Sequence, residues 1–349
     1  MKTEKSKKIV SLLLLLLAIT FVQAQTLTMP EVSQDATITQ RVGISDVTIK
    51  YNSPGALGRK IFGGIIPYNA IWRAGANENT TIHFTHNAMV EGEKIKAGTY
   101  GLYMIPGKQK FQIIFSKNSK NWGTVLPTEK ETALKVSVAP KSNAFQERLG
   151  YNFTERSANN LVAVLDWADV RVPFKIEFDV VQIVIENAKV ELEGQTGNSG
   201  IGYMQLASYC LQNNTNLDEA MTWAENSISI KKTFSNLRVK ADLLSKKGQH
   251  VAAEKIMNEA FPIGNIWELN IYGYSLLNEN KIKEAIKIFT FNIEKHSNDT
   301  LIWRFIDSLG EAYLKDGNKK MALKYYKEAK EKAPADQYVY FDSVIASIK

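Results

Sequence analysis

The spacing of apolar residues changes once along this chain of 349 residues, near position 182. Before that point apolar side chains recur at every second position, and after it they recur about once per helical turn. Side chains alternate between the two faces of a strand, whereas residues three or four apart share one face of a helix. The sequence therefore predicts two modules, an all-β module followed by an all-α one.

The first module, over residues 25–182, shows strand-like alternation in several short runs. In the clearest run, five apolar residues between Val172 and Val180 alternate with Pro173, Lys175, Glu177 and Asp179. Turn residues such as those of 52–55 separate the runs. Many short strands without a convincing helix favour an antiparallel β-sandwich or a barrel, and the alternation leaves both open. Similar runs occupy 47–51, 82–84, 111–115 and 134–138.

The second module, over residues 183–349, repeats a helical pattern four times around Ala220, Ala253, Ala285 and Ala322. These intervals lie close to the roughly 34-residue period of tetratricopeptide helix pairs, in which a small residue lets two helices approach closely. We therefore expect a short α-solenoid with a weak first copy. The stretch 183–192 is either part of the boundary or a connecting helix. The last copy keeps Leu309, Gly310, Tyr313, Ala322, Tyr326, Ala329 and Pro334 at the family offsets.

The first 24 residues have the pattern of a cleaved signal peptide. Four lysines precede an apolar run from Ile9 to Val22, and Val22-Gln23-Ala24 suits a signal peptidase, with Gln25 as the mature start. The run is shorter than the roughly 20 residues that span a bilayer, so an uncleaved anchor is disfavoured. We expect export to the periplasm or medium, with no transmembrane segment after signal removal.

Charge and motif content argue against several classes of function. The formal net charge is +7, of which +3 lies in residues 1–24, and the rest is spread along the chain rather than clustered as nucleic-acid binding requires. The single cysteine, Cys210, excludes an intrachain disulfide, and no P-loop or nucleophile elbow occurs. His83 and His86 would face opposite sides of a strand. We therefore expect no metal and no cofactor, and the sequence carries no catalytic signature.

Two loops, 58–64 and 71–80, interrupt the alternation and combine glycine with arginine, tryptophan, asparagine and glutamate. Glycine allows close backbone approach, and arginine and asparagine donate hydrogen bonds to carboxylate, phosphate or sugar groups. In the alternative interpretation Arg73 pairs with Glu78, Asn77 closes a turn and Trp72 belongs to the core. The candidate ligand-binding residues are Arg59, Trp72, Arg73, Asn77, Glu78 and, from a third loop, Trp122.

The same loops resemble a known family. The runs 58–63, 71–80, 96–100 and 121–123 are similar to the bacterial family catalogued as domain of unknown function 2911, over roughly residues 30–180. The resemblance implies one coherent β domain and no assigned activity. Members often have arginine at the position of Ser53 and tryptophan at the position of Phe111, so a family site that uses that arginine would be altered in this chain.

Together these features predict an exported, non-catalytic binding or scaffolding protein. Its helical repeats would dock a protein or peptide partner, and its β domain would bind a small anionic or sugar ligand. The alternative is an envelope hydrolase or carbohydrate-active enzyme that uses Arg59, Arg73, Asn77 and Glu78.

Overall fold

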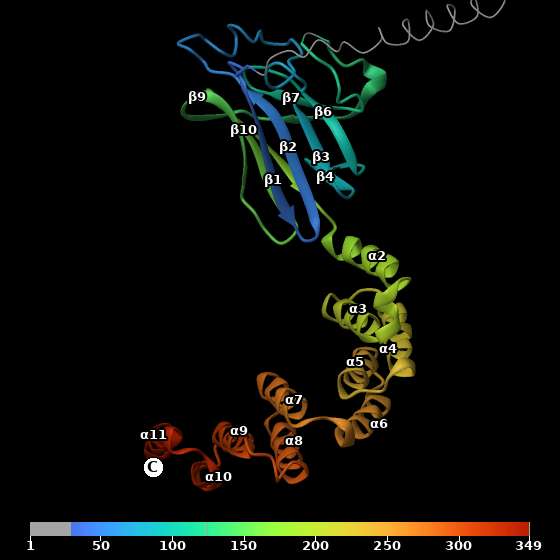
Figure 1. The fold of residues 1–349 in the computed structure, drawn as a ribbon, viewed down its shortest axis with the longest axis vertical. Helices are drawn as coiled ribbons and strands as arrows, with labels where there is room; N and C mark the ends of the chain where they lie inside the picture. The colour runs from blue at the N-terminus through green and yellow to red at the C-terminus, as the bar shows by residue number, and fades with distance from the viewer. Residues whose placement is uncertain (1–28, 124, 349) are drawn as a thin grey trace, which may run out of the picture. The chain divides into compact units, whose positions relative to one another are not determined.

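The computed structural model describes residues 29–123 and 125–348, and the signal segment expected at 1–24 lies outside them. The chain divides between Val180 and Val181 into two compact units, called here the β unit and the helical unit (Figure 1). A β module followed by a helical one is the fold class expected from the change of spacing. Within the described residues, no helix has both the length and the apolarity required to cross a bilayer.

The β unit contains two antiparallel sheets. One has six strands in the order β1-β2-β3-β6-β7-β8, and the other has four in the order β5-β4-β10-β9. Phe115 of the first sheet meets Phe174 of the second edge to face, with ring centroids 6.3 Å apart. The sheets therefore pack face to face as a sandwich, which settles the choice left open by the sequence. The strands are β1 Gln34–Val42, β2 Ser45–Ser53, β3 Thr81–Phe84, β4 Ala88–Val90, β5 Glu93–Ile95, β6 Gly98–Ile105, β7 Phe111–Ser116, β8 Thr132–Val138, β9 Lys141–Thr154 and β10 Asn160–Glu177.

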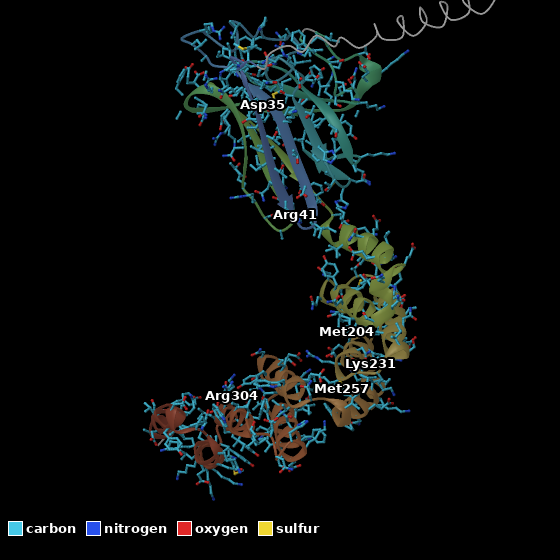
Figure 2. The ribbon with its side chains drawn as sticks, in the orientation of Figure 1. Asp35, Arg41, Met204, Lys231, Met257 and Arg304 are labelled. Carbon is cyan, nitrogen blue, oxygen red and sulfur yellow. The ribbon has the colours of Figure 1, made fainter. Side chains whose placement is uncertain are left out.

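The runs with clear alternation form the buried strands of the sandwich. Val172, Phe174 and Ile176 lie on the inward face of β10 and are fully buried. The edge strand β1 is mostly exposed, and Arg41 lies near its end (Figure 2). The Arg41 guanidinium donates two hydrogen bonds to Asp46 of the neighbouring strand β2. Burial thus follows the period of two wherever a strand has one face against the opposite sheet.

The helical unit stacks helices in antiparallel pairs. Figure 1 shows α3, α5, α7 and α9 along the inner side of the curved stack, with α4, α6, α8 and α10 along its outer side. The segment 183–192 belongs to a helix, α2, whose Ile185 and Leu192 join the core formed with α3 and α4. The helices are α2 Val180–Leu192, α3 Ile201–Gln212, α4 Leu217–Ile230, α5 Phe234–Lys246, α6 His250–Ala260, α7 Ile266–Asn278, α8 Ile282–Lys295, α9 Ile302–Lys315, α10 Lys319–Lys332 and α11 Tyr338–Ile348.

The recurring alanines mark the contact between the two helices of each pair. Each lies near the start of a second helix, and all four are buried. A small residue on the first helix completes the contact. At Gly273 an added Cβ would lie 2.4 Å from the ring of Phe289, whereas at Gly310 it would lie 3.3 Å from the ring of Tyr326. The repeat expected from the sequence therefore marks the recurring contact between paired helices, and the tetratricopeptide-like arrangement is confirmed.

Gly273→Ala tests this packing. Alanine is favoured over glycine in a helix by about 1 kcal/mol, but the new methyl group would overlap the Phe289 ring, and overpacking typically costs 1–3 kcal/mol. We expect a lower free energy of unfolding of the helical unit, measured by denaturant titration with circular dichroism of the full chain. Gly310→Ala is the matched control, because its methyl group fits against Tyr326 after a small shift. Equal stability of the two variants would contradict this account.

Candidate functional site

The side chain of Arg59 forms hydrogen bonds within its own loop. Its Nε donates to the carbonyl oxygen of Ala56 at 3.0 Å, and its Nη2 donates to that of Gly55 at 2.8 Å. The backbone of Ala56 is in turn bound to the carbonyl of Glu147. These contacts fasten the 54–59 loop against β9, and the Arg59 guanidinium stabilises the turn.

Trp72 lies in the core of the β unit, with only 7% of its surface exposed. Its indole stacks on Trp167 at 5.7 Å between centroids and packs edge-on against Phe62. The indole N–H donates to the carbonyl of Gly75. This burial agrees with the alternative interpretation of Trp72 as a core residue, and it leaves almost no indole surface for a ligand.

Arg73 and Asn77 connect neighbouring segments. Arg73 Nη1 donates to the carbonyl of Gly123 at 3.1 Å, its Nε is buried without a partner among the described residues, and burial lowers the pKa of the guanidinium. Asn77 has the left-handed φ of 51° that asparagine tolerates, and its amide donates to Glu31 and to the carbonyl of Ser33. No pairing of Arg73 with Glu78 is present among the described residues.

Glu78 and Trp122 are the two predicted residues that meet at one cavity. Its volume is about 350 Å³, and it opens on the outer face of the six-stranded sheet. Arg59, Trp72, Arg73 and Asn77 are not among its lining residues. Of the six residues predicted to bind a ligand, Glu78 and Trp122 therefore share this cavity, and the sequence did not predict its other lining residues. The lining is Lys50, Tyr51, Asn52, Glu78, Asn79, Thr81, Ser119, Lys120, Asn121 and Trp122, and we call it the Trp122 cavity.

A buried polar network forms the back of the Trp122 cavity. The hydroxyl of Tyr103 donates to Asn79 Oδ1 and accepts from Asn121 Nδ2 at 3.0 Å. Asn118 extends the network, donating to Asn121 Oδ1 at 2.9 Å and to Glu131 Oε1 at 3.0 Å. Burial raises the pKa of Tyr103, which keeps the hydroxyl protonated as a donor. The network ties the 117–123 loop to strand β6.

The 117–123 loop can lie close to β6 because residue 101 is glycine. A Cβ there would lie 2.6 Å from the carbonyl oxygen of Asn118 and 3.0 Å from the amide of Asn79. Two backbone hydrogen bonds complete the attachment, from Asn79 to Asn121 and from Gly123 to Asn77, each at 3.2 Å. The cavity wall that carries Trp122 is therefore held at several points.

The histidines stay apart from this cavity. His83 shares a hydrogen bond with Thr99 at 2.8 Å, and His86 shares one with Thr85 at 3.1 Å. Among residues 29–123 and 125–348, no three His, Cys, Asp or Glu side chains are grouped as a metal site would require. Cys210 is buried in the helical core, and burial raises the pKa of its thiol.

The helical unit presents a second candidate surface, which we call the α7–α9 face and define by Trp267, Ile271, Tyr274, Asp307, Glu311 and Tyr340. On α7, Trp267 is 47% exposed and Ile271 is 61% exposed. Trp267 packs edge-on against Phe305 at 4.9 Å. Both helices lie on the inner side of the stack (Figure 1), and the exposed fractions of Trp267 and Ile271 show that no described helix fully covers these side chains.

Two carboxylates lie beside these apolar residues. Tyr274 donates to Glu311 at 2.9 Å, and Tyr340 of α11 donates to Asp307 at 3.3 Å. Burial, reinforced by the charge of Glu311, raises the pKa of Asp307 to about 6. No lysine or arginine among the described residues forms an ion pair with Asp307, so its desolvation has no compensating cation.

Comparison with known proteins relates the β unit to one family. Residues 33–176 match the family model described as protein of unknown function (DUF2911). The match spans nearly the whole β unit, and we refer to this unit below as the DUF2911 domain. The resemblance expected from the loop motifs is confirmed, and the Trp122 cavity is a feature of the DUF2911 domain of this chain. A comparison with curated proteins found no match.

Several solved structures are similar to part of the chain. They include YrrB, described as a TPR protein with an unusual peptide-binding site, at 16% identity and a TM-score of 0.28, covering 47% of this chain and 83% of YrrB. PilF of Pseudomonas aeruginosa matches at 16% identity and a TM-score of 0.30, covering 44% of this chain and 69% of PilF. The C-terminal part of a TPR repeat-containing protein of Cytophaga hutchinsonii matches at 20% identity and a TM-score of 0.30. The match covers 45% of this chain and 65% of that protein's chain.

Sequence reasoning missed most of the residues that line the Trp122 cavity. Lys50 and Thr81 are directly opposed on β2 and β3, and Lys120 reaches the cavity from the 117–123 loop. An exposed lysine on a strand carries no local signal of function. The only available signal was the register between strands, which brings Lys50 and Thr81 to the same face of the DUF2911 domain.

Tyr103→Phe tests the network behind the cavity. Removing the hydroxyl leaves Asn79 Oδ1 and Asn121 Nδ2 without this partner in a buried site, and an unsatisfied buried group costs about 1–3 kcal/mol. We expect the free energy of unfolding of the DUF2911 domain to fall by that amount, measured by denaturant titration with tryptophan fluorescence. Tyr51→Phe is the control, because the Tyr51 hydroxyl has no hydrogen-bond partner among the described residues. A loss as large in Tyr51→Phe would refute the network's role.

Proposed function

We propose that this protein is an exported, non-catalytic binding protein. Its helical unit docks an extended segment of a partner protein on the α7–α9 face, and its DUF2911 domain binds a small anionic or sugar ligand in the Trp122 cavity. The observation that carries the docking proposal is the exposed pair Trp267 and Ile271 beside an uncompensated carboxylate, Asp307.

The exposed apolar residues support a protein partner. Stacked helical repeats curve so that one helix of each pair lines an extended concave surface, which is the usual binding surface of solenoids. Trp267 is held in place by Phe305 yet remains about half exposed. Aromatic side chains of this kind supply most of the energy of protein interfaces.

The carboxylates specify the charge of the partner. Asp307 and Glu311 lie one helical turn apart on α9, and tyrosine hydroxyls are their partners on neighbouring helices. Glu311 also has Lys315 one turn further along, at 3.4 Å. A lysine or arginine of the docked segment would supply the cation that Asp307 lacks. The partner segment is therefore basic, with apolar side chains spaced to reach Trp267 and Ile271.

A phage-displayed library of random peptides, screened against the full chain, tests the docking proposal. We expect the selected peptides to share a lysine or arginine flanked by apolar residues. Trp267→Ala should weaken their binding at least about tenfold, because a central aromatic residue of an interface is typically worth 2 kcal/mol or more. Val251→Ala, at an exposed apolar position on the second helix α6, is the matched control and should bind as the unaltered chain does.

The contribution of the Asp307 charge is tested by measuring the affinity of the selected peptides as a function of pH. A bound cation favours ionised Asp307, so binding below a pKa of about 6 must release a proton and is weaker. Affinity should rise from about pH 5 to about pH 7 and then level off, and Asp307→Asn should flatten this rise. Glu331→Gln, on α10, should leave the rise intact. Selection of acidic peptides, or equal binding by Trp267→Ala, would refute the proposal.

The proposed setting is outside the cytoplasm. The support is the lysine-rich start and the apolar run that end at Ala24. We expect N-terminal sequencing of the protein purified from its native cells to begin at Gln25. A chain that retains residues 1–24 would contradict export by this route.

A further inference from the structure

The Trp122 cavity combines an exposed aromatic ring on a fastened loop with charged groups that form no ion pair among the described residues. The Trp122 indole is 68% exposed, although its backbone pairs with that of Glu78 and its neighbours are tied to Asn77 and Asn79. The backbone that carries this large apolar ring is fastened, while most of the ring itself lies outside the core of its own domain. The ring offers a flat face to a ligand with a flat apolar side, such as the C–H face of a sugar ring.

Two ammonium groups lie at the same cavity. Lys50 stands on β2 directly opposite Thr81, and Lys120 stands two residues before Trp122. Among residues 29–123 and 125–348, neither lysine forms an ion pair, and the Glu78 carboxylate of the same cavity is not within ion-pair distance of either. Both cations are therefore available to an anionic group of a ligand.

The remaining lining groups favour hydroxyl recognition. The Glu78 carboxylate and the hydroxyls of Thr81 and Ser119 have no side-chain hydrogen bonds within the described part of the chain. The amides of Asn79 and Asn121, by contrast, are engaged in the Tyr103 network and form a fixed wall. A carboxylate without a hydrogen-bonded partner accepts hydrogen bonds from hydroxyl groups and would repel a ligand that carries several phosphates.

We infer that the Trp122 cavity binds an acidic saccharide, a sugar that carries a carboxylate. Its ring stacks on Trp122, its acid group lies between Lys50 and Lys120, and its hydroxyls donate to Glu78. This inference rests on the ligand part of the proposed function and narrows it to one class. A nucleotide could use the aromatic ring and the lysines, but Glu78 disfavours its phosphates.

Calorimetric titration of the full chain with uronic acid trisaccharides tests the inference. The probes are the galacturonate, glucuronate and mannuronate trimers, each with its methyl ester, together with adenosine monophosphate and inorganic phosphate. We expect at least one acid trimer to bind about tenfold more tightly than its ester, a difference of 1.4 kcal/mol. The affinity should fall as salt is added, because the lysines are exposed.

Variants separate the stacking contribution from the charge contribution. Trp122→Ala should weaken binding of the acid trimer and of its ester alike, whereas the double variant Lys50→Met and Lys120→Met should weaken only the acid and remove its advantage over the ester. Phe145→Ala and Lys135→Met change an exposed aromatic residue on β9 and an exposed lysine on β8 outside the cavity, and they should bind normally.

The outcomes distinguish this inference from the broader ligand proposal. If an ester, phosphate or the nucleotide binds as tightly as every acid trimer and the cavity variants abolish that binding, the acidic-saccharide assignment is wrong but a ligand site remains. If no probe binds, or if binding is insensitive to all cavity variants, both the assignment and the ligand role of this cavity are overturned.

Discussion

Each half of this chain buries its apolar side chains against elements of its own kind, and the positions of both candidate binding surfaces follow from that constraint. A strand in a sandwich has one face to bury, so its outer face is left for polar residues. A paired helix in a stack buries one side against its partner and one against the next pair. The Trp122 cavity lies on an outer sheet face, and the α7–α9 face lies on the uncovered side of first helices.

Two carboxylates differ in how the structure compensates their charge, and this difference distinguishes a structural ion pair from the proposed docking surface. Asp166, within β10, is buried, and the guanidinium of Arg171 donates two hydrogen bonds to it at 2.7 Å. Asp307, on the α7–α9 face, accepts one side-chain hydrogen bond within the described part of the chain, from the Tyr340 hydroxyl, and burial raises its pKa to about 6. A charge inside a fold is normally paired. The contrast indicates that Asp166 is satisfied by its own domain, whereas Asp307 gains most from a cation that comes from elsewhere.

The parts of the fold that could be predicted are those in which one local period decides burial. The alternation of β10 and the four alanines of the repeats are such cases, because each residue's environment depends on neighbours one strand or one helix away. Strand β9 was missed because its first eight residues are mostly exposed on both faces and therefore show no alternation. Its pairing with β10 is decided by contacts that the local spacing does not encode.

The candidate site shows the same limit at the level of single side chains. Trp72 and Trp122 both stand in glycine-rich loops with similar neighbours, yet one is buried and the other is mostly exposed. The difference comes from Trp167, which lies 95 positions after Trp72 in the chain and stacks on its ring. Trp122 has no stacking partner among residues 29–123 and 125–348, because the Tyr103 network holds its loop on the outer face of the sheet. Which tryptophan can meet a ligand is therefore decided by tertiary packing, and the residue types in the loops narrow the choice only to the pair.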